Sequence, residues 1–200
     1  MAGQFFKDLD ISSPDVSLDV GPGPHEFQTT EVMKLIEAVF ERERPDVVIV
    51  VGDVNSTVAG AITASKMQIR AVHVEAGLRS FDRTMSEEIN RVITDAVSDY
   101  LFVSEESGLH SLAVEGVEKN KVFFVGNVMI DSLEVSRHTW GRSSIHAQLG
   151  VTPGKYGVMT LHRSSNVDQP RILRKLLGAI AVVAEGRPVI FPVHPRPGNG

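Results

Sequence analysis

Three carboxylates between residues 45 and 91 stand where acid–base chemistry is commonly found. Asp53 follows an apolar run, Glu75 ends the next one, and Glu87 falls in the first turn of an expected helix. A carboxylate in such a place can act as a general acid or base once burial or a neighbouring charge adjusts its pKa. Each of them alone could equally be a helix cap, a turn former or a partner of the helix dipole. The three together favour proton transfer.

Arginines are interleaved with these carboxylates. Arg79, Arg83 and Arg91 lie in the same part of the chain, and clustered arginines suit an anionic ligand such as a phosphate. Arg79 and Arg91 could bind that ligand, or they could form structural ion pairs with Glu75 and Glu87. The sequence leaves both alternatives open.

The elements around the carboxylates predict that two of them meet. Residues 46–51 form an apolar, β-branched run of the length expected for a strand buried on both faces, and residues 71–75 form the next strand. A helix rich in small residues, 57–66, joins the two. Because the carboxyl ends of parallel strands open into the ligand crevice, Asp53 and Glu75 should project toward one site.

The rest of the chain alternates strands with helices, which indicates βαβ units and a mainly parallel, Rossmann-like α/β fold. Further strands are expected at 100–103, 121–125, 156–160 and 188–191, and helices at 31–43, 105–114, 129–137 and 171–184. Thr29 or Thr30 is expected to cap the first of these helices. The stretch 141–155 is expected to link an N-terminal domain, 1–140, to the incomplete second domain, 156–200.

Two histidines are expected to have no part in the site. His73 lies inside an apolar strand, where packing or hydrogen bonding is the expected role. His25 lies in a loop rich in glycine and proline, where an exposed surface residue is expected. The 7 histidines are scattered, with no pair at the spacing of zinc ligands. No metal or other cofactor is therefore expected.

The composition narrows the class of partner. Of the 200 residues, 42% are hydrophobic and 22% are charged, as in an ordinary soluble globular chain, and the formal net charge is −5. Neither nucleic acid nor a membrane is expected as a partner, so local arginines would have to hold an anionic ligand. The sequence contains no cysteine, which excludes disulfides and thiolate catalysis and fits a cytoplasmic protein.

Several segments together resemble the non-hydrolysing UDP-N-acetylglucosamine 2-epimerases. Three of them surround the carboxylates: Gly-Asp-Val-Asn-Ser at 52–56, His-Val-Glu-Ala-Gly-Leu-Arg at 73–79 and Glu-Glu-Ile-Asn-Arg at 87–91. The others are Val-Gly-Asn-Val-Met-Ile-Asp at 125–131, Thr-Leu-His-Arg at 160–163, Asn-Val-Asp at 166–168 and His-Pro-Arg at 194–196. Separate motifs in the right order make the resemblance specific, and it covers nearly the whole chain.

The resemblance implies a two-domain, glycosyltransferase-B-like fold that binds a UDP-sugar and inverts sugar C2 by elimination and re-addition of UDP. By match to the family, Asp53, Glu75 and Glu87 form the acid–base set, and His162 stabilises the departing diphosphate. For its full-length members, the family also implies a homodimer. The remaining substrate contacts that the resemblance implies are Arg79, Arg91, Asn127, Arg163, His194 and Arg196.

The chain also departs from the family pattern. No segment corresponds to the family's opening strand with its Gly-Thr-Arg-Pro-Glu, and most of the second domain would lie beyond Gly200. A fragment truncated at both ends is therefore expected. Ser165 stands where the family usually has Glu, which removes a charged partner next to His162, and Ser86 stands where Pro is usual.

Other functions fit the same residues. A sugar-nucleotide glycosyltransferase of the same fold is one alternative, because fold alone does not fix the reaction. It would need one well-placed base and an acceptor site. A catalytically inactive fragment could retain nucleotide-sugar binding, and a hydrolysing epimerase would release the free sugar. Within the family, the substrate could also be a diacetamido uronic acid in place of N-acetylglucosamine.

Overall fold

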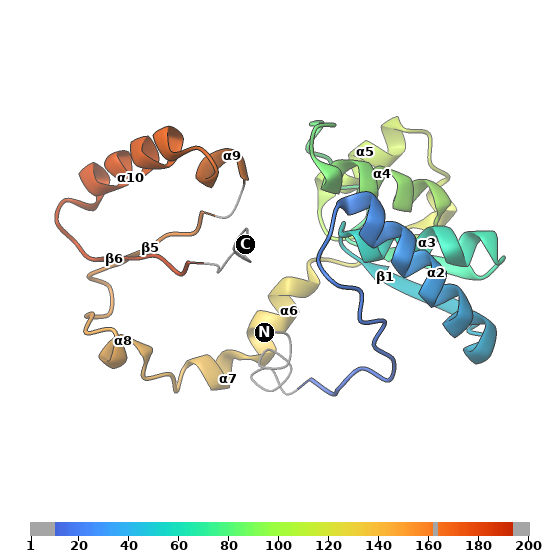
Figure 1. Ribbon diagram of the computed structural model, residues 1–200, viewed down its shortest axis with the longest axis horizontal. Coiled ribbons are helices and arrows are strands. Elements are labelled where there is room, and N and C mark those ends of the chain that lie inside the picture. Colours follow the sequence, from blue (N-terminus) through green and yellow to red (C-terminus); the bar gives the residue numbers. More distant parts are fainter. Residues whose placement is uncertain (1–10, 162–163, 194–200) are drawn as a thin grey trace. The chain divides into compact units, whose positions relative to one another are not determined.

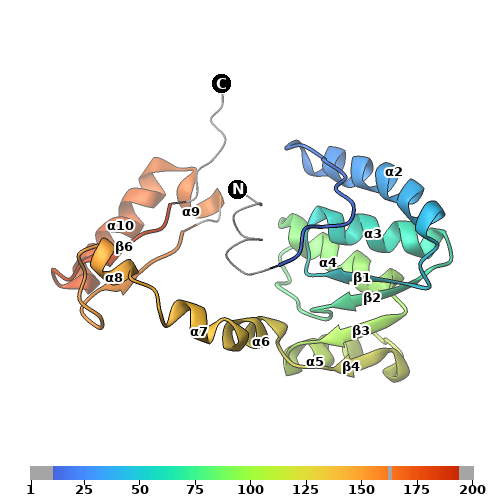
Figure 2. The ribbon, with the colours of Figure 1, turned by 90° about the horizontal axis from the view of Figure 1, so that it is seen from below.

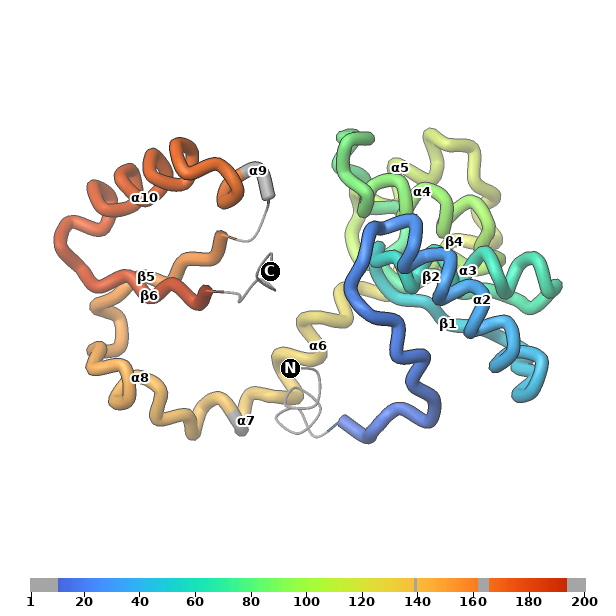
Figure 3. The backbone as a smooth tube through the Cα atoms, in the orientation of Figure 1, coloured from blue at the N-terminus to red at the C-terminus, as the bar shows by residue number. Residues whose placement is uncertain are grey.

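The computed structural model of the protein describes residues 11–161 and 164–193 (Figure 1). The chain divides into two compact units, Met1–Ser136 and Arg137–Gly200. Figure 3 draws the backbone of both units as a tube coloured from the N-terminus to the C-terminus. Among the described helices, none has the length and hydropathy needed to span a bilayer.

The N-terminal unit is built on a sheet of four parallel strands in the order β1-β2-β3-β4 (Figure 2). Val50 of β1 pairs with His73 of β2, and His73 pairs with Leu101 of β3. The predicted α/β fold with parallel sheets is therefore confirmed. The strands are β1 Val47–Val51, β2 Arg70–Val74, β3 Tyr100–Val103 and β4 Val122–Phe124.

A helix lies between each strand and the next along the sheet, because parallel strands need a crossover connection. The helices of this unit are α2 His25–Glu43, α3 Asn55–Lys66, α4 Ser86–Val97, α5 Glu106–Val114 and α6 Val128–Val135, with a short 3₁₀ turn, Lys119–Lys121, before β4.

Helix α2 begins earlier than the sequence predicted. The expected start lay at Thr29 or Thr30 as a capping residue, but the helix begins at His25. The Thr29 hydroxyl donates to the carbonyl of His25 at 2.8 Å, and the Thr30 hydroxyl donates to the carbonyl of Glu26 at 2.7 Å. Both threonines therefore use the bond to residue i−4 that lets a threonine sit inside a helix, so the cap prediction was wrong.

Strand β1 is buried on one face only, which corrects the prediction of burial on both. Val50 is 8% exposed, whereas Ile49 is 64% exposed on the opposite face. The strand lies at the edge of the sheet, and the helices pack on the Val50 side, where Phe40, Ala64 and Ala71 form a core cluster. An apolar run in the sequence indicates that a strand could be buried on both faces. It does not show that other segments cover both faces.

A close approach between two glycines fixes the loop that follows β2. Gly77 has a left-handed φ of +80°, and a Cβ on it would lie 2.6 Å from the carbonyl oxygen of Gly108 in α5. Only glycine combines that backbone with that space. Next to this contact, a core cluster of Ala76, Leu101, Val103 and Leu112 packs α5 onto the sheet.

In the C-terminal unit, β5 (Gly157–Val158) pairs in parallel with β6 (Val189–Ile190), with Gly157 opposite Val189. Helix α10, Pro170–Ala184, connects them after the short helix α9, Ser164–Val167. The stretch expected as a linker, 141–155, includes helix α8, Ile145–Gln148, and α7, Arg137–Trp140, precedes it. Strands β5 and β6 are both shorter than the predicted strands 156–160 and 188–191.

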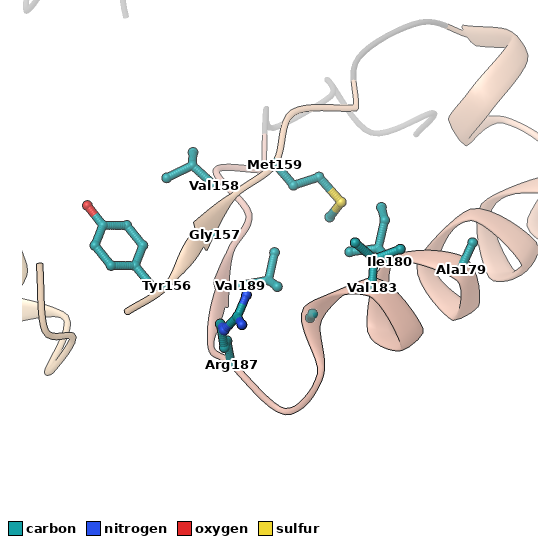
Figure 4. A pocket seen from close by; sticks show the side chains of 10 residues that line it. Tyr156, Gly157, Val158, Met159, Ala179, Ile180, Val183, Arg187 and Val189 are labelled. Atoms are coloured by element: carbon teal, nitrogen blue, oxygen red, sulfur yellow. The ribbon is translucent and has the colours of Figure 1, made fainter. Parts of the chain in front are cut away.

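A cavity of about 440 Å³ opens between this strand pair and α10 (Figure 4). Its lining is apolar except for Tyr156 and Arg187. The acid–base candidates Asp53, Glu75 and Glu87 all belong to the N-terminal unit, so none of them lines this cavity.

The contact around Gly108 gives a testable prediction. A Cβ on Gly108 would lie 2.7 Å from Cγ1 of Val103 and 3.0 Å from the carbonyl oxygen of Ala76. Gly108→Ala should therefore lower the free energy of unfolding by about 1–3 kcal/mol through overpacking, measured by urea denaturation with circular dichroism. Gly178→Ala in α10 is the matched control, because nothing lies within 4 Å of its added Cβ. Equal stability of the two variants would contradict the tight contact.

Candidate active site

Asp53 and Glu75 lie at the carboxyl ends of adjacent strands, as predicted. Glu75 has a left-handed φ of +73°, and Gly52, just before Asp53, has a φ of +72°. The Glu75 Oε2 atom lies 3.6 Å from the position that a Cβ on Gly52 would take. The Glu75 carboxylate therefore lies against the turn that carries Asp53.

Backbone hydrogen bonds hold both turns in place. The N–H of Gly52 donates to the carbonyl of Val74 at 3.0 Å, and the N–H groups of Glu75 and Ala76 both donate to the carbonyl of Phe102, at 3.0 and 3.1 Å. A non-glycine residue in the left-handed region costs on the order of 1 kcal/mol, and such residues concentrate at functional sites. Glu75 is held in this conformation by the surrounding sheet.

Arg91 joins the Asp53 turn to helix α4. Its Nη2 donates to Oδ2 of Asp53, and its Nη1 donates to Oε2 of Glu88 at 2.9 Å and to the carbonyl of Leu78 at 3.3 Å. The Arg91 side chain is 13% exposed and the Asp53 side chain 31%. Of the two alternatives for Arg91, the ion pair is present, but with Asp53 and Glu88 in place of Glu87.

Glu88 is a buried structural carboxylate that the sequence did not single out. It accepts hydrogen bonds from the N–H and hydroxyl of Ser80, both at 2.8 Å, and from the N–H of Phe81 at 3.1 Å. Burial raises the pKa of Glu88, but these hydrogen bonds and the charge of Arg91 outweigh it, so the net effect lowers the pKa. Glu88 therefore stays ionised and fixes the loop between β2 and α4.

Glu87, the predicted acid–base member on α4, is exposed, next to the buried Glu88. Its carboxylate accepts a hydrogen bond from the hydroxyl of Ser86 at 3.1 Å. Glu87 and Arg91 are four residues apart, so they share one face of α4. Since Arg91 contacts Asp53, Glu87 lies on the side of the helix that faces the Asp53 turn.

Arg79 makes different contacts from those predicted. Its Nη1 lies 2.7 Å from Oδ2 of Asp95, and its Nε and Nη2 donate to the carboxylate of Glu115 at 2.8 and 2.7 Å. Burial works against the charge of Arg79, but the bonds to Glu115 and the charge of Asp95 raise its pKa well above the usual range. The side chain is 2% exposed, so these contacts favour the structural alternative, with partners other than Glu75 and Glu87.

Comparison with known proteins identifies the family of the chain. The model of the family described as UDP-N-acetylglucosamine 2-epimerase covers residues 1–199. The chain belongs to this family. A UDP-N-acetylglucosamine 2-epimerase of Methanocaldococcus jannaschii is 43% identical over 197 residues, which are 96% of this chain and 54% of that protein. The chain thus spans about half the length of the curated relatives it matches.

A solved structure and a further protein are also similar to this chain. A crystal structure of the Methanocaldococcus jannaschii UDP-GlcNAc 2-epimerase in complex with UDP-GlcNAc and UDP is 42% identical, with a TM-score of 0.87, over 96% of this chain and 54% of that one. A UDP-2,3-diacetamido-2,3-dideoxy-D-glucuronate 2-epimerase of Pseudomonas aeruginosa is 40% identical over 200 residues, 98% of this chain and 55% of that protein. The structural likeness supports the predicted glycosyltransferase-B-like fold class.

In this member of the epimerase family, an amide network that the sequence did not predict supports the Asp53 turn. The Asn90 side chain donates to the carbonyl of Asp53 at 2.9 Å and to Oδ1 of Asn55 at 3.2 Å. Asn55 in turn donates to Oε1 of Gln28 at 2.8 Å and lies 3.1 Å from Nδ1 of His25. His25 is exposed, as expected, but its ring is part of this network. The presence of Asn90 within the family motif 87–91 was the available signal.

The other predicted contacts are placed in part. Asn127 follows β4 and caps α6, because its Oδ1 accepts the N–H of Met129 at 2.9 Å. His162, Arg163, His194 and Arg196 lie outside the described residues, so their roles stay predictions. Within the described part of the chain, no group of three or more histidine, aspartate or glutamate side chains could hold a metal ion.

The Glu88 contacts predict how stability depends on pH. The pKa of Glu88 in the folded protein lies below its ordinary value of 4.5, so its contribution to the free energy of unfolding is present above that pH and is lost as pH falls through the lowered pKa. Glu88→Gln should lower the free energy of unfolding by about 1–3 kcal/mol at neutral pH, since a charged acceptor is lost.

Thermal melts at neutral pH and at about pH 3 check this prediction, because the two proteins should differ less in acid. Glu87→Gln is the matched control: its side chain is exposed, and its effect should stay within about 0.5 kcal/mol. A difference between Glu88→Gln and the native protein that is the same at both pH values would contradict the assignment.

Proposed function

We propose that the protein is a UDP-N-acetylglucosamine 2-epimerase and that this chain carries its acid–base carboxylates. The observation that carries the proposal is the contact of the Glu75 carboxylate with the turn of Asp53 at the carboxyl edge of the sheet. Family membership and the named activity of the Methanocaldococcus jannaschii relative support it.

The proposed reaction moves one proton and one leaving group. A base removes the proton from sugar C2 while the bond from C1 to the UDP oxygen breaks, which leaves a 2-acetamidoglucal and UDP. UDP then returns to C1 and an acid delivers a proton to the opposite face of C2. A reaction that changes faces needs carboxylates on both sides of the ring, so Asp53, Glu75 and Glu87 share the acid and base roles.

The diphosphate needs positive charge as it leaves C1. Arg91, one helical turn from Glu87, supplies a cation beside the carboxylates, although it is engaged with Asp53 and Glu88. By match to the family, His162, Arg163, His194 and Arg196 provide the remaining contacts to the diphosphate, and Asn127 contributes from the end of β4. We also propose the cytoplasmic location and the homodimer of the full-length family for this protein.

A second substrate is supported by a specific similarity. The Pseudomonas aeruginosa relative, 40% identical, is named for a diacetamido glucuronate. That sugar carries a carboxylate, so it would require a further cation near C5. Parallel assays with both UDP-sugars distinguish the two substrates, because the protein should show a lower kcat/KM for the poorer one.

The main test measures deuterium at C2. The protein incubated with UDP-N-acetylglucosamine in heavy water should incorporate deuterium at C2 and form the manno epimer, followed by NMR. Asp53→Asn, Glu75→Gln and Glu87→Gln should each reduce this exchange by about 10²- to 10⁴-fold, the usual contribution of a general acid or base. Glu106→Gln, an exposed carboxylate in α5, is the matched control and should exchange at the native rate.

The other outcomes assign the alternatives. Free UDP without an epimer would indicate hydrolysis, and transfer of the sugar to an acceptor would indicate a glycosyltransferase. UDP binding without exchange would indicate an inactive chain. If the native protein exchanges and none of the three variants is slower, the proposed acid–base set is wrong.

A further inference from the structure

His73 is a fully buried histidine beneath the candidate site, at 0% exposed, in the middle of β2. Its Nδ1 lies 2.6 Å from Oδ1 of Asp95, and its Nε2 lies 2.9 Å from the carbonyl oxygen of Gly52. The ring therefore connects helix α4 to the turn after β1. Neither contact has a role in the proposed chemistry.

Both partners of the ring are acceptors. The peptide carbonyl of Gly52 can only accept, so Nε2 must carry a hydrogen. On the other side, Oδ2 of Asp95 accepts the N–H of Gly77 at 3.0 Å and lies 2.7 Å from Nη1 of Arg79. A guanidinium at that distance favours the ionised carboxylate, so Oδ1 of Asp95 is an acceptor too. Nδ1 must then also carry a hydrogen.

We propose that His73 is an imidazolium and that it is a positioning residue for the acid–base carboxylates. One N–H holds the carbonyl of Gly52, directly before Asp53, and the other holds Asp95, whose second oxygen holds Gly77 in the loop after Glu75. One ring thereby fixes the turns of both carboxylates. The link to catalysis rests on the proposed function, whereas the protonation state does not.

The charges around the ring are consistent with this state. Arg79 and the imidazolium face the carboxylate of Asp95, and Glu115 at the end of α5 pairs with the far side of Arg79. Asp53 and Glu75 lie on the turns that the ring supports. Helix α3, which also packs on β2, carries one ionisable side chain, Lys66, in its last turn. Two cations are thus surrounded by carboxylates.

The protonation state can be observed directly. In a two-bond ¹H–¹⁵N correlation spectrum at about pH 8, where an ordinary exposed histidine with a pKa of about 6.5 is neutral, both ring nitrogens of His73 should carry hydrogen. His110, which is exposed, provides the comparison within the same spectrum. A His73 ring with one bare nitrogen would overturn the proposal, whether or not the protein is active.

Asp95→Asn isolates the charge from the hydrogen bonds. The asparagine can present its oxygen to Gly77 and Arg79 and donate its NH₂ to Nδ1 of His73, so every bond is kept while His73 becomes neutral. Asp99→Asn is the matched control, because Asp99 also accepts a backbone N–H, in its case that of Ala71 near the start of β2, at 2.9 Å.

The positioning role has its own measurement. In Asp95→Asn, the amide hydrogens of Gly52 and Glu75 should exchange about 5- to 10-fold faster than in the native protein, since charge-assisted hydrogen bonds become neutral ones. In Asp99→Asn they should exchange at the native rate. Unchanged exchange in Asp95→Asn, with His73 shown to be neutral, would overturn the positioning role.

Activity then tests the link to catalysis. If the native protein epimerises, Asp95→Asn should lower kcat by up to about 10²-fold with little change in KM, as expected for misplaced groups that do not touch the substrate. A native kcat in Asp95→Asn would refute that link. An inactive native protein would refute the proposed function, while the NMR and amide exchange results would still decide the state and the role of His73.

Discussion

The arrangement of the N-terminal unit depends on a buried carboxylate, Asp95. Its two oxygens bind His73 of β2, the backbone N–H of Gly77 and the guanidinium of Arg79, so helix α4, the central strand and the loop after it are joined at one point. A buried charge is tolerated only when its hydrogen-bonding capacity is met. The paths of these three segments are therefore coupled, and any shift of α4 would leave a charge unpaired in the interior.

The two neighbouring glutamates of α4 show how such coupling separates structural from chemical groups. Glu88 faces inward, is 3% exposed, and is saturated by Ser80, Phe81 and Arg91. Glu87, one residue earlier, faces solvent at the start of the same helix. Successive residues on a helix point about 100° apart, so one carboxylate can fix the loop while the other remains available for a ligand. The rigid support and the reactive group are thus adjacent in the sequence.

The left-handed backbone at Glu75 is held in place by the sheet. The left-handed turns at Gly52 and Glu75 place the Glu75 carboxylate against the turn that carries Asp53. They persist because Val74 and Phe102 accept their N–H groups and a glycine leaves room for the Glu75 carboxylate. Pre-organisation of this kind places the cost of the left-handed backbone in the folding of the sheet, so that it need not be met when a ligand binds.

The sequence by itself determined the parallel α/β class, the strand ends that carry Asp53 and Glu75, and the family, because hydrophobic periodicity and motif order are local properties. The start of α2 and the exposed face of β1 were misjudged, since a threonine can bond within a helix and coverage of a strand depends on distant segments. Only the tertiary structure decided that Arg79 pairs with Asp95 and Glu115, that Glu88 is the buried carboxylate, and that Asn90 holds the Asp53 turn. Those choices depend on which side chains fold to within hydrogen-bonding distance. The partners of Arg79 and Asn90 lie 16 to 37 positions away in the chain, so no local signal reports that proximity.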